Sequence, residues 1–188
     1  MAGAGESADT AVQDAEPHTG WCAPYALVTQ ARVRIRTGDE GAAELLERAR
    51  NAAVAQGDRQ AQRTVRSAQA ELSVRDGRPK EALELLAAQV EPGTAYLAAR
   101  ARLGCGRPDE AAEPVCVERA GEGPAETEAL TVHAVALAAL GRERDAREGF
   151  DRAAALADAL PYPAGARQAV RARDRALSPP QDSLTAVK

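Results

Sequence analysis

Residues 134–153 read AVALAALGRERDAREGFDRA, and this stretch decides the fold of the chain. Ala134 lies seven residues before Gly141, and Ala146 lies five residues after it. Phe150 follows Ala146 by four residues, which places both on one face of a helix. Seven residues are about two helical turns, and glycine suits the left-handed conformation in which many helices end. The stretch therefore predicts two helices joined by a short turn, with small residues where the helices approach each other.

The same pattern occurs at three other glycines, spaced by 39, 29 and 35 residues. Such spacings are typical of helical repeats. The turn glycines are Gly38, Gly77, Gly106 and Gly141. The alanines seven residues earlier are Ala31, Ala70, Ala99 and Ala134, and those five residues later are Ala43, Ala82, Ala111 and Ala146.

The composition agrees with an all-α fold. Alanine makes up about a quarter of the 188 residues, leucine, arginine and glutamate are frequent, and aromatic residues are only 3%. These abundant residues are strong helix formers. A core of alanine and leucine also requires helix backbones to lie close together, since small side chains cannot fill wide gaps.

The repeated strings resemble the tetratricopeptide repeat. Ala134, Gly141, Ala146, Phe150 and Ala153 match its small residue, turn glycine, alanine, bulky apolar residue and second alanine. The first copy departs from the pattern, with Glu47 where the bulky apolar residue belongs. The resemblance implies a right-handed α-solenoid of about four helix hairpins, closed by a C-terminal capping helix.

We expect a disordered acidic tail over 1–20, a helical repeat domain over 24–177 and a second disordered tail over 178–188. Pro114 falls inside one expected helix, which we therefore expect to be kinked or shortened. The expected helices are 24–37, 41–56, 58–76, 79–90, 94–104, 108–119, 124–140, 143–160 and 163–177.

The sequence offers no constellation for catalysis, so we expect no enzyme, no cofactor and no metal. His18 and His133 lie far apart, and no Cys-x-x-Cys pair, His-Glu-x-x-His motif or nucleophile elbow occurs. The three cysteines and the lack of an apolar leader predict a cytoplasmic protein, and no apolar stretch is long enough to span a membrane.

Charge argues against direct nucleic-acid binding. The net charge of −4 comes from Glu6, Asp9, Asp14 and Glu16, because the rest of the chain holds 24 acidic and 24 basic residues. A neutral body with few aromatic rings lacks the basic field and the stacking platforms that nucleic acids usually require.

The resemblance implies that the first helix of each hairpin, the A helix, lines a concave groove that binds extended or helical peptides. This groove would be basic toward its N-terminal half and apolar toward its C-terminal half, which suits a peptide partner with acidic and hydrophobic elements. The residues that we expect to contact the partner are Arg32, Arg36, Glu71, Arg75, Tyr96 and Arg100. The other positions carried over include Val28, Ile35, Ser67, Val74, Leu103, Thr131, Val135 and Ala138.

Three alternatives remain open from the sequence. The arginines could be ordinary solvated helix residues balanced by Glu71. The acidic residues 6–16 could fold back into the groove as an intramolecular competitor. Asp151-Arg152-Ala153 through Leu160-Pro161-Tyr162-Pro163 is also similar to the helical sensor arm of ATP-dependent LuxR-type regulators of actinobacteria, so the chain could be a regulatory or truncated relative without their DNA- and ATP-binding domains.

Overall fold

The computed structural model describes residues 20–87, 94–113, 123–160 and 162–178, and all regular structure in these ranges is helical. The chain divides into two compact units, Met1–Val90 and Glu91–Lys188, which are described separately. Unit 1 contains α2 (Ala23–Thr37), α3 (Ala42–Ala55), α4 (Arg59–Arg75) and α5 (Pro79–Ala87). Unit 2 contains α6 (Ala95–Gly104), α7 (Pro108–Ala111), α9 (Pro124–Ala139), α10 (Glu143–Ala159) and α11 (Pro163–Leu177).

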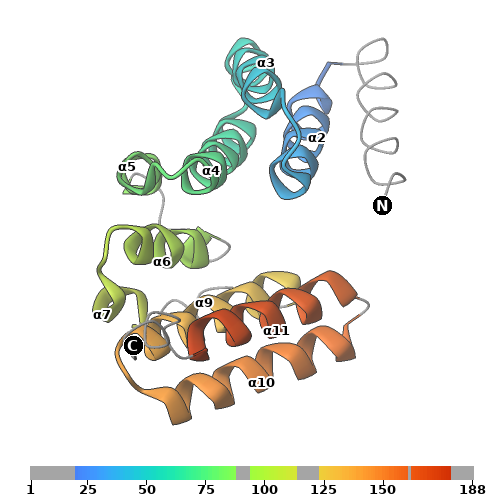
Figure 1. Cartoon of the computed structure of the whole chain (residues 1–188). Coiled ribbons are helices and arrows are strands. Elements are labelled where there is room, and N and C mark those ends of the chain that lie inside the picture. The colour runs from blue at the N-terminus through green and yellow to red at the C-terminus, as the bar shows by residue number, and fades with distance from the viewer. Residues whose placement is uncertain (1–19, 88–93, 114–122, 161, 179–188) are drawn as a thin grey trace, which may run out of the picture. The chain divides into compact units, whose positions relative to one another are not determined.

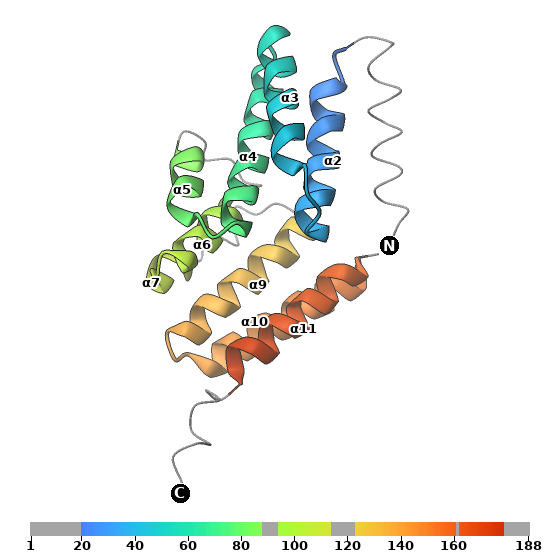
Figure 2. The same cartoon turned by 45° about the horizontal axis from the view of Figure 1, so that its top comes forward.

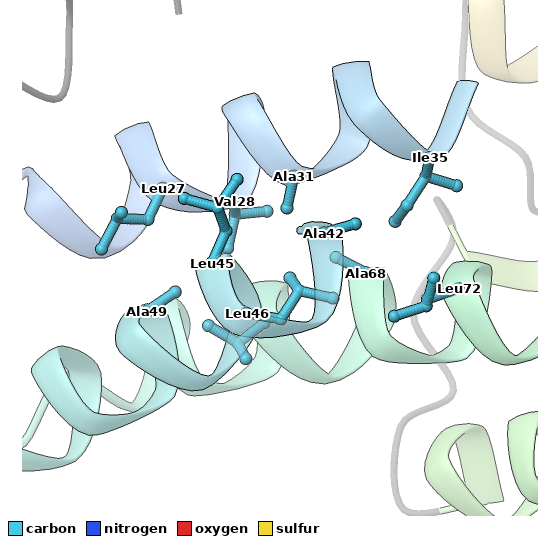
Figure 3. Packing of buried hydrophobic residues seen from close by; sticks show 11 residues of the cluster. Leu27, Val28, Ala31, Ile35, Ala42, Leu45, Leu46, Ala49, Ala68 and Leu72 are labelled. Carbon is cyan, nitrogen blue, oxygen red and sulfur yellow. The ribbon is translucent and has the colours of Figure 1, made fainter. Parts of the chain in front are cut away.

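In unit 1, α2 and α3 form a hairpin and α4 packs against both of them, while α5 packs against α4 (Figures 1 and 2). The core between α2, α3 and α4 consists of leucine, valine, isoleucine and alanine. Figure 3 shows these side chains pointing toward one another from the three helices. The core residues are Leu27, Val28, Ala31, Ile35, Ala42, Leu45, Leu46, Ala49, Val65, Ala68 and Leu72.

Unit 2 contains two groups of three helices in mutual contact, which share α9. Helices α6, α7 and α9 pack against one another, and so do α9, α10 and α11 (Figure 1). The second of these groups encloses Phe150, which is 1% exposed, together with Leu137 and three small residues, Ala134, Ala146 and Ala172. Each group of three buries an apolar face that a single hairpin would leave exposed.

The alanines that precede the turn glycines by seven residues are confirmed as close-approach positions. All four have an exposed fraction of 0%: Ala31, Ala70, Ala99 and Ala134. At Ala134 the approach is so close that a Cβ placed on Gly149 of α10 would lie 3.0 Å from the Ala134 Cβ. Small residues on both helices therefore set the spacing between α9 and α10.

The turn glycines adopt the expected left-handed conformation, with φ between 72° and 81° at Gly38, Gly77, Gly106 and Gly141. Three of the alanines five residues later are also fully buried: Ala82, Ala111 and Ala146.

The first copy differs from the expected register. A second left-handed glycine, Gly41 (φ 84°), delays the start of α3, so Ala42 is buried and Ala43 is exposed. Leu46 then takes the bulky buried position, and Glu47 points to solvent. The prediction that Ala43 occupies the close-approach position was wrong by one residue, and the departure noted at Glu47 follows from the same shift.

The helix bounds otherwise agree with the expected ones to within one residue at almost every described end. The main exception is α7, which ends at Ala111 instead of reaching 119. Glu113 is not helical, as expected for the residue before a proline. Pro114 itself, residues 88–90 of the expected fourth helix and the tails over 1–19 and 179–188 lie outside the described residues.

Candidate functional site

The basic residues of unit 1 are concentrated on α2 and α4. These two helices together carry seven arginines and one acidic residue, Glu71. By contrast, α3 has two arginines and two glutamates, and α5 has one lysine and two glutamates. The arginines are Arg32, Arg34, Arg36, Arg59, Arg63, Arg66 and Arg75.

Glu71 lies between two of these arginines, at the contact of α4 with α2. Its side chain is only 7% exposed. The Nε atom of Arg32 lies 3.5 Å from Glu71 Oε2, and the Nε atom of Arg36 lies 3.6 Å from Glu71 Oε1. Arg32 also donates a hydrogen bond of 3.3 Å from Nη2 to Ser67 Oγ. We call Arg32, Arg36, Ser67 and Glu71 the arginine face.

The burial of these groups is uneven. Glu71 and Ser67 are buried, whereas the side chains of Arg32 and Arg36 are 37% and 52% exposed. Among the described residues, Arg32 Nε and Glu71 Oε2 are buried atoms without a hydrogen-bond partner, although the two atoms attract each other as an ion pair. The buried carboxylate thus offsets part of the positive charge, and both guanidinium groups remain partly open to solvent.

Arg75, one turn beyond Glu71 on α4, forms a different ion pair. Its Nη2 lies 2.8 Å from Asp76 Oδ1, and Arg78 contacts the other oxygen of Asp76 at 3.2 Å. Burial raises the pKa of Asp76, but the hydrogen bonds and charges of Arg75 and Arg78 outweigh burial, so the pKa lies below its ordinary value. The structure therefore brings Arg32, Arg36 and Glu71 together and ties Arg75 to the following turn.

The expected contact residues of unit 2 are less accessible than the sequence suggested. Tyr96 of α6 is 7% exposed, and Arg100 is half-buried. On α9, Thr131 is buried, while Val135 and Ala138 pack against the cluster around Phe150. The apolar residues expected at this end of the groove thus take part in the core of unit 2.

Two partly buried polar contacts were not anticipated from the sequence. The hydroxyl of Tyr162 donates to Glu128 Oε1 of α9 at 3.1 Å, and Glu128 is 8% exposed. The hydroxyl of Tyr25 donates to Asp58 Oδ2 at 2.9 Å, and Asp58 caps α4 by accepting from the Ala61 amide. An aspartate before a helical run signals such a cap, whereas no local pattern indicates either tyrosine partner.

Other kinds of site find little support in the described part of the chain. No three histidine, cysteine, aspartate or glutamate side chains there are grouped so as to hold a metal ion. None of the described helices combines the length and apolarity needed to cross a bilayer. An open depression of about 390 Å³ beside α4 and α5 is lined by Arg66, Glu81, Glu84 and Leu85.

Comparison with known proteins adds no relative to this picture: no protein-family model matches the chain, and neither does any curated protein or solved structure. The resemblances to the tetratricopeptide repeat and to the LuxR-type sensor arm therefore remain predictions from the residues quoted above.

Proposed function

We propose that this chain is a helical-repeat interaction module of the tetratricopeptide type, which binds an acidic peptide or protein segment on its arginine face. The observation that carries the proposal is the separation of charge in unit 1. Seven arginines and one glutamate lie on the A helices α2 and α4, and the neighbouring helices are balanced or slightly acidic.

The packing within each unit supports the repeat assignment. Three helices contact both their own hairpin partner and the first helix of the hairpin or cap that follows. These contacts join α2 to α4, α6 to α9, and α9 to α11. Fully buried alanines at the same offset from each turn glycine allow these close approaches. Stacked hairpins of this kind derive their stability from neighbour contacts and expose a continuous surface of A helices.

The chemistry of the arginine face favours carboxylates as ligands. A guanidinium group presents planar N–H donors that match the two oxygens of a carboxylate, and such charge-assisted hydrogen bonds are stronger than neutral ones. Arg32 and Arg36 are held near each other by the shared Glu71, so they are partly ordered before a partner arrives. Preorganisation of this kind reduces the entropy lost on binding.

A capture experiment with matched variants tests the proposal. The full chain is immobilised and exposed to an extract of its native host, and the captured proteins are identified by mass spectrometry. Arg32→Gln/Arg36→Gln/Glu71→Gln removes the charges of the arginine face without leaving a buried carboxylate unpaired. Arg144→Gln/Arg147→Gln changes two exposed arginines of α10 and serves as the control.

We expect a defined partner that the wild type and the control retain and the triple variant loses. The affinity of the purified partner for the wild type should then fall as the salt concentration is raised, since partly exposed charges are screened. A partner retained equally by all three chains would show that the arginine face is not the binding site.

A further inference from the structure

The acidic residues of the N-terminal segment and the basic helices of unit 1 adjoin each other in the chain. Residues 1–19 contain four acidic residues and no lysine or arginine. They are followed at once by α2, which has three arginines and no acidic residue. Over residues 20–87, unit 1 has eleven basic and nine acidic residues, so a negatively charged segment precedes a positively charged body. The acidic residues are Glu6, Asp9, Asp14 and Glu16.

The N-terminal segment starts from a defined point. Gly20 precedes α2, and its carbonyl oxygen accepts a hydrogen bond from the side-chain amide of Gln56, the residue that follows α3. The segment therefore begins where the N-terminal end of α2 lies beside the C-terminal end of α3. Both arginines of the arginine face lie further along α2.

The segment is long enough to reach the arginine face. At 1.5 Å per residue, Arg32 lies about 14 Å and Arg36 about 20 Å along the axis from the first residue of α2. An extended chain spans at most about 3.5 Å per residue, so Asp14 can lie about 20 Å from Gly20, and Asp9 nearly twice as far. Asp14 can thus reach Arg32, and Asp9 can reach Arg36 with length to spare.

We infer that the N-terminal segment 6–16 occupies the arginine face as an intramolecular competitor of the external partner. The inference rests on the proposed function, because it assigns to a part of this chain the kind of ligand that the arginine face is proposed to bind. Tethering gives the segment an effective concentration in the millimolar range, so even a weak contact excludes part of any external ligand.

The first test uses nuclear magnetic resonance on the full chain, without any added ligand. Glu6→Gln/Asp9→Asn/Asp14→Asn/Glu16→Gln neutralises the segment without shortening it. We expect its backbone amide signals to shift at Arg32, Arg36 and their neighbours on α2 and α4, and high salt should shift the wild-type signals in the same direction. Signals on α2 and α4 that match those of the wild type would overturn the inference.

The control neutralises an equal number of exposed acidic residues on α10. Its substitutions are Glu143→Gln, Glu148→Gln, Asp151→Asn and Asp158→Asn. This variant should leave the signals of α2 and α4 unchanged, because it alters the net charge equally but not the proposed occupant. Shifts on α2 and α4 as large in the control as in the segment variant would also overturn the inference.

A binding measurement separates failure of this inference from failure of the proposed function. A labelled peptide with the sequence of residues 4–18 is titrated into both full chains. We expect the peptide to bind the neutralised chain about fivefold more tightly. This ratio applies when the effective concentration of the tethered segment is several-fold above the dissociation constant of its own contact with the arginine face. Equal binding to both chains would overturn the inference and leave the arginine face as a site for acidic peptides, whereas absence of binding to either chain would count against both proposals.

Discussion

Glu71 on α4 approaches Arg32 on α2 to 3.5 Å, and the two closest atoms, Glu71 Oε2 and Arg32 Nε, are both buried without a hydrogen-bond partner among the described residues. The contact is thus an ion pair with imperfect hydrogen-bond geometry between α2 and α4. A pair of this kind adds less to stability than its charges suggest, because removing the groups from water offsets much of their attraction.

The first prediction concerns the stability of this pair. Arg32→Gln should lower the free energy of unfolding by about 1–2 kcal/mol, because Glu71 then stays buried with only Arg36 beside it. Arg36→Gln should have a smaller effect, since Arg36 is 52% exposed. Urea unfolding measures both changes. The triple variant Arg32→Gln/Arg36→Gln/Glu71→Gln should recover most of the loss. If it loses as much stability as its three single substitutions lose in sum, the ion-pair account is refuted.

The second prediction tests the register of α3. Ala42→Leu should destabilise the chain by about 2 kcal/mol, because Ala42 is 2% exposed and an added side chain overpacks the core of unit 1. Ala43→Leu, one residue further on, should change stability by less than about 0.5 kcal/mol because Ala43 is exposed. Thermal and urea unfolding distinguish the two. The opposite order of effects would restore the register expected from the sequence.

The third prediction concerns the start of α11. A Cβ placed on Gly165 would overlap the ring of Tyr162, so Gly165→Ala must displace the ring that hydrogen-bonds to Glu128. We expect a loss of about 1–2 kcal/mol, although alanine favours helix over glycine by about 1 kcal/mol. In a Tyr162→Ala background the same substitution should become stabilising. Stabilisation by Gly165→Ala in the wild-type chain would show that the ring moves aside without loss.

The fourth prediction is a dependence of stability on pH. Burial lowers the pKa of His133, and the positive charges of Arg142 and Arg152 lower it further. The unfolded chain then binds the proton more readily than the folded chain, so stability should fall as the pH drops below the ordinary value of 6.5. The pKa values of Asp58 and Asp76 are lowered, so their contributions to stability are lost only as the pH falls below the ordinary value of 3.8.

Urea unfolding between about pH 7.5 and pH 5 measures the effect of His133 alone, because these two carboxylates do not change protonation state in that range. His133→Gln should remove the slope in this range. A slope that persists in His133→Gln would place the titrating group elsewhere.

The sequence predicted the helices and their closest contacts well, but it predicted less well which side chains are accessible to solvent. Ala31, Ala70, Ala99 and Ala134 were identified because each precedes a turn glycine by seven residues, and all four are fully buried. This succeeds because the turn and the helical period together determine which face of the helix is covered.

The register of α3 was missed because two glycines, Gly38 and Gly41, both suit a left-handed conformation, and the sequence does not tell which one ends the turn. The accessibility of the expected groove was harder to predict still. Tyr96 was expected to face a partner at the surface, but it is 7% exposed. Arg32 and Arg36 remain partly exposed because their long side chains extend beyond the packed alanines.

The most direct test of the account is a titration of one labelled peptide, rich in glutamate, aspartate and leucine, into three full chains. Fluorescence anisotropy yields its affinity for the wild type, for Arg32→Gln/Arg36→Gln/Glu71→Gln and for Glu71→Gln. The account predicts weaker binding to the triple variant and tighter binding to Glu71→Gln, because the negative charge beside Arg32 and Arg36 is then removed, which outweighs the order that Glu71 gives to the two side chains. Affinities that stay equal, or that fall in both variants, would contradict it.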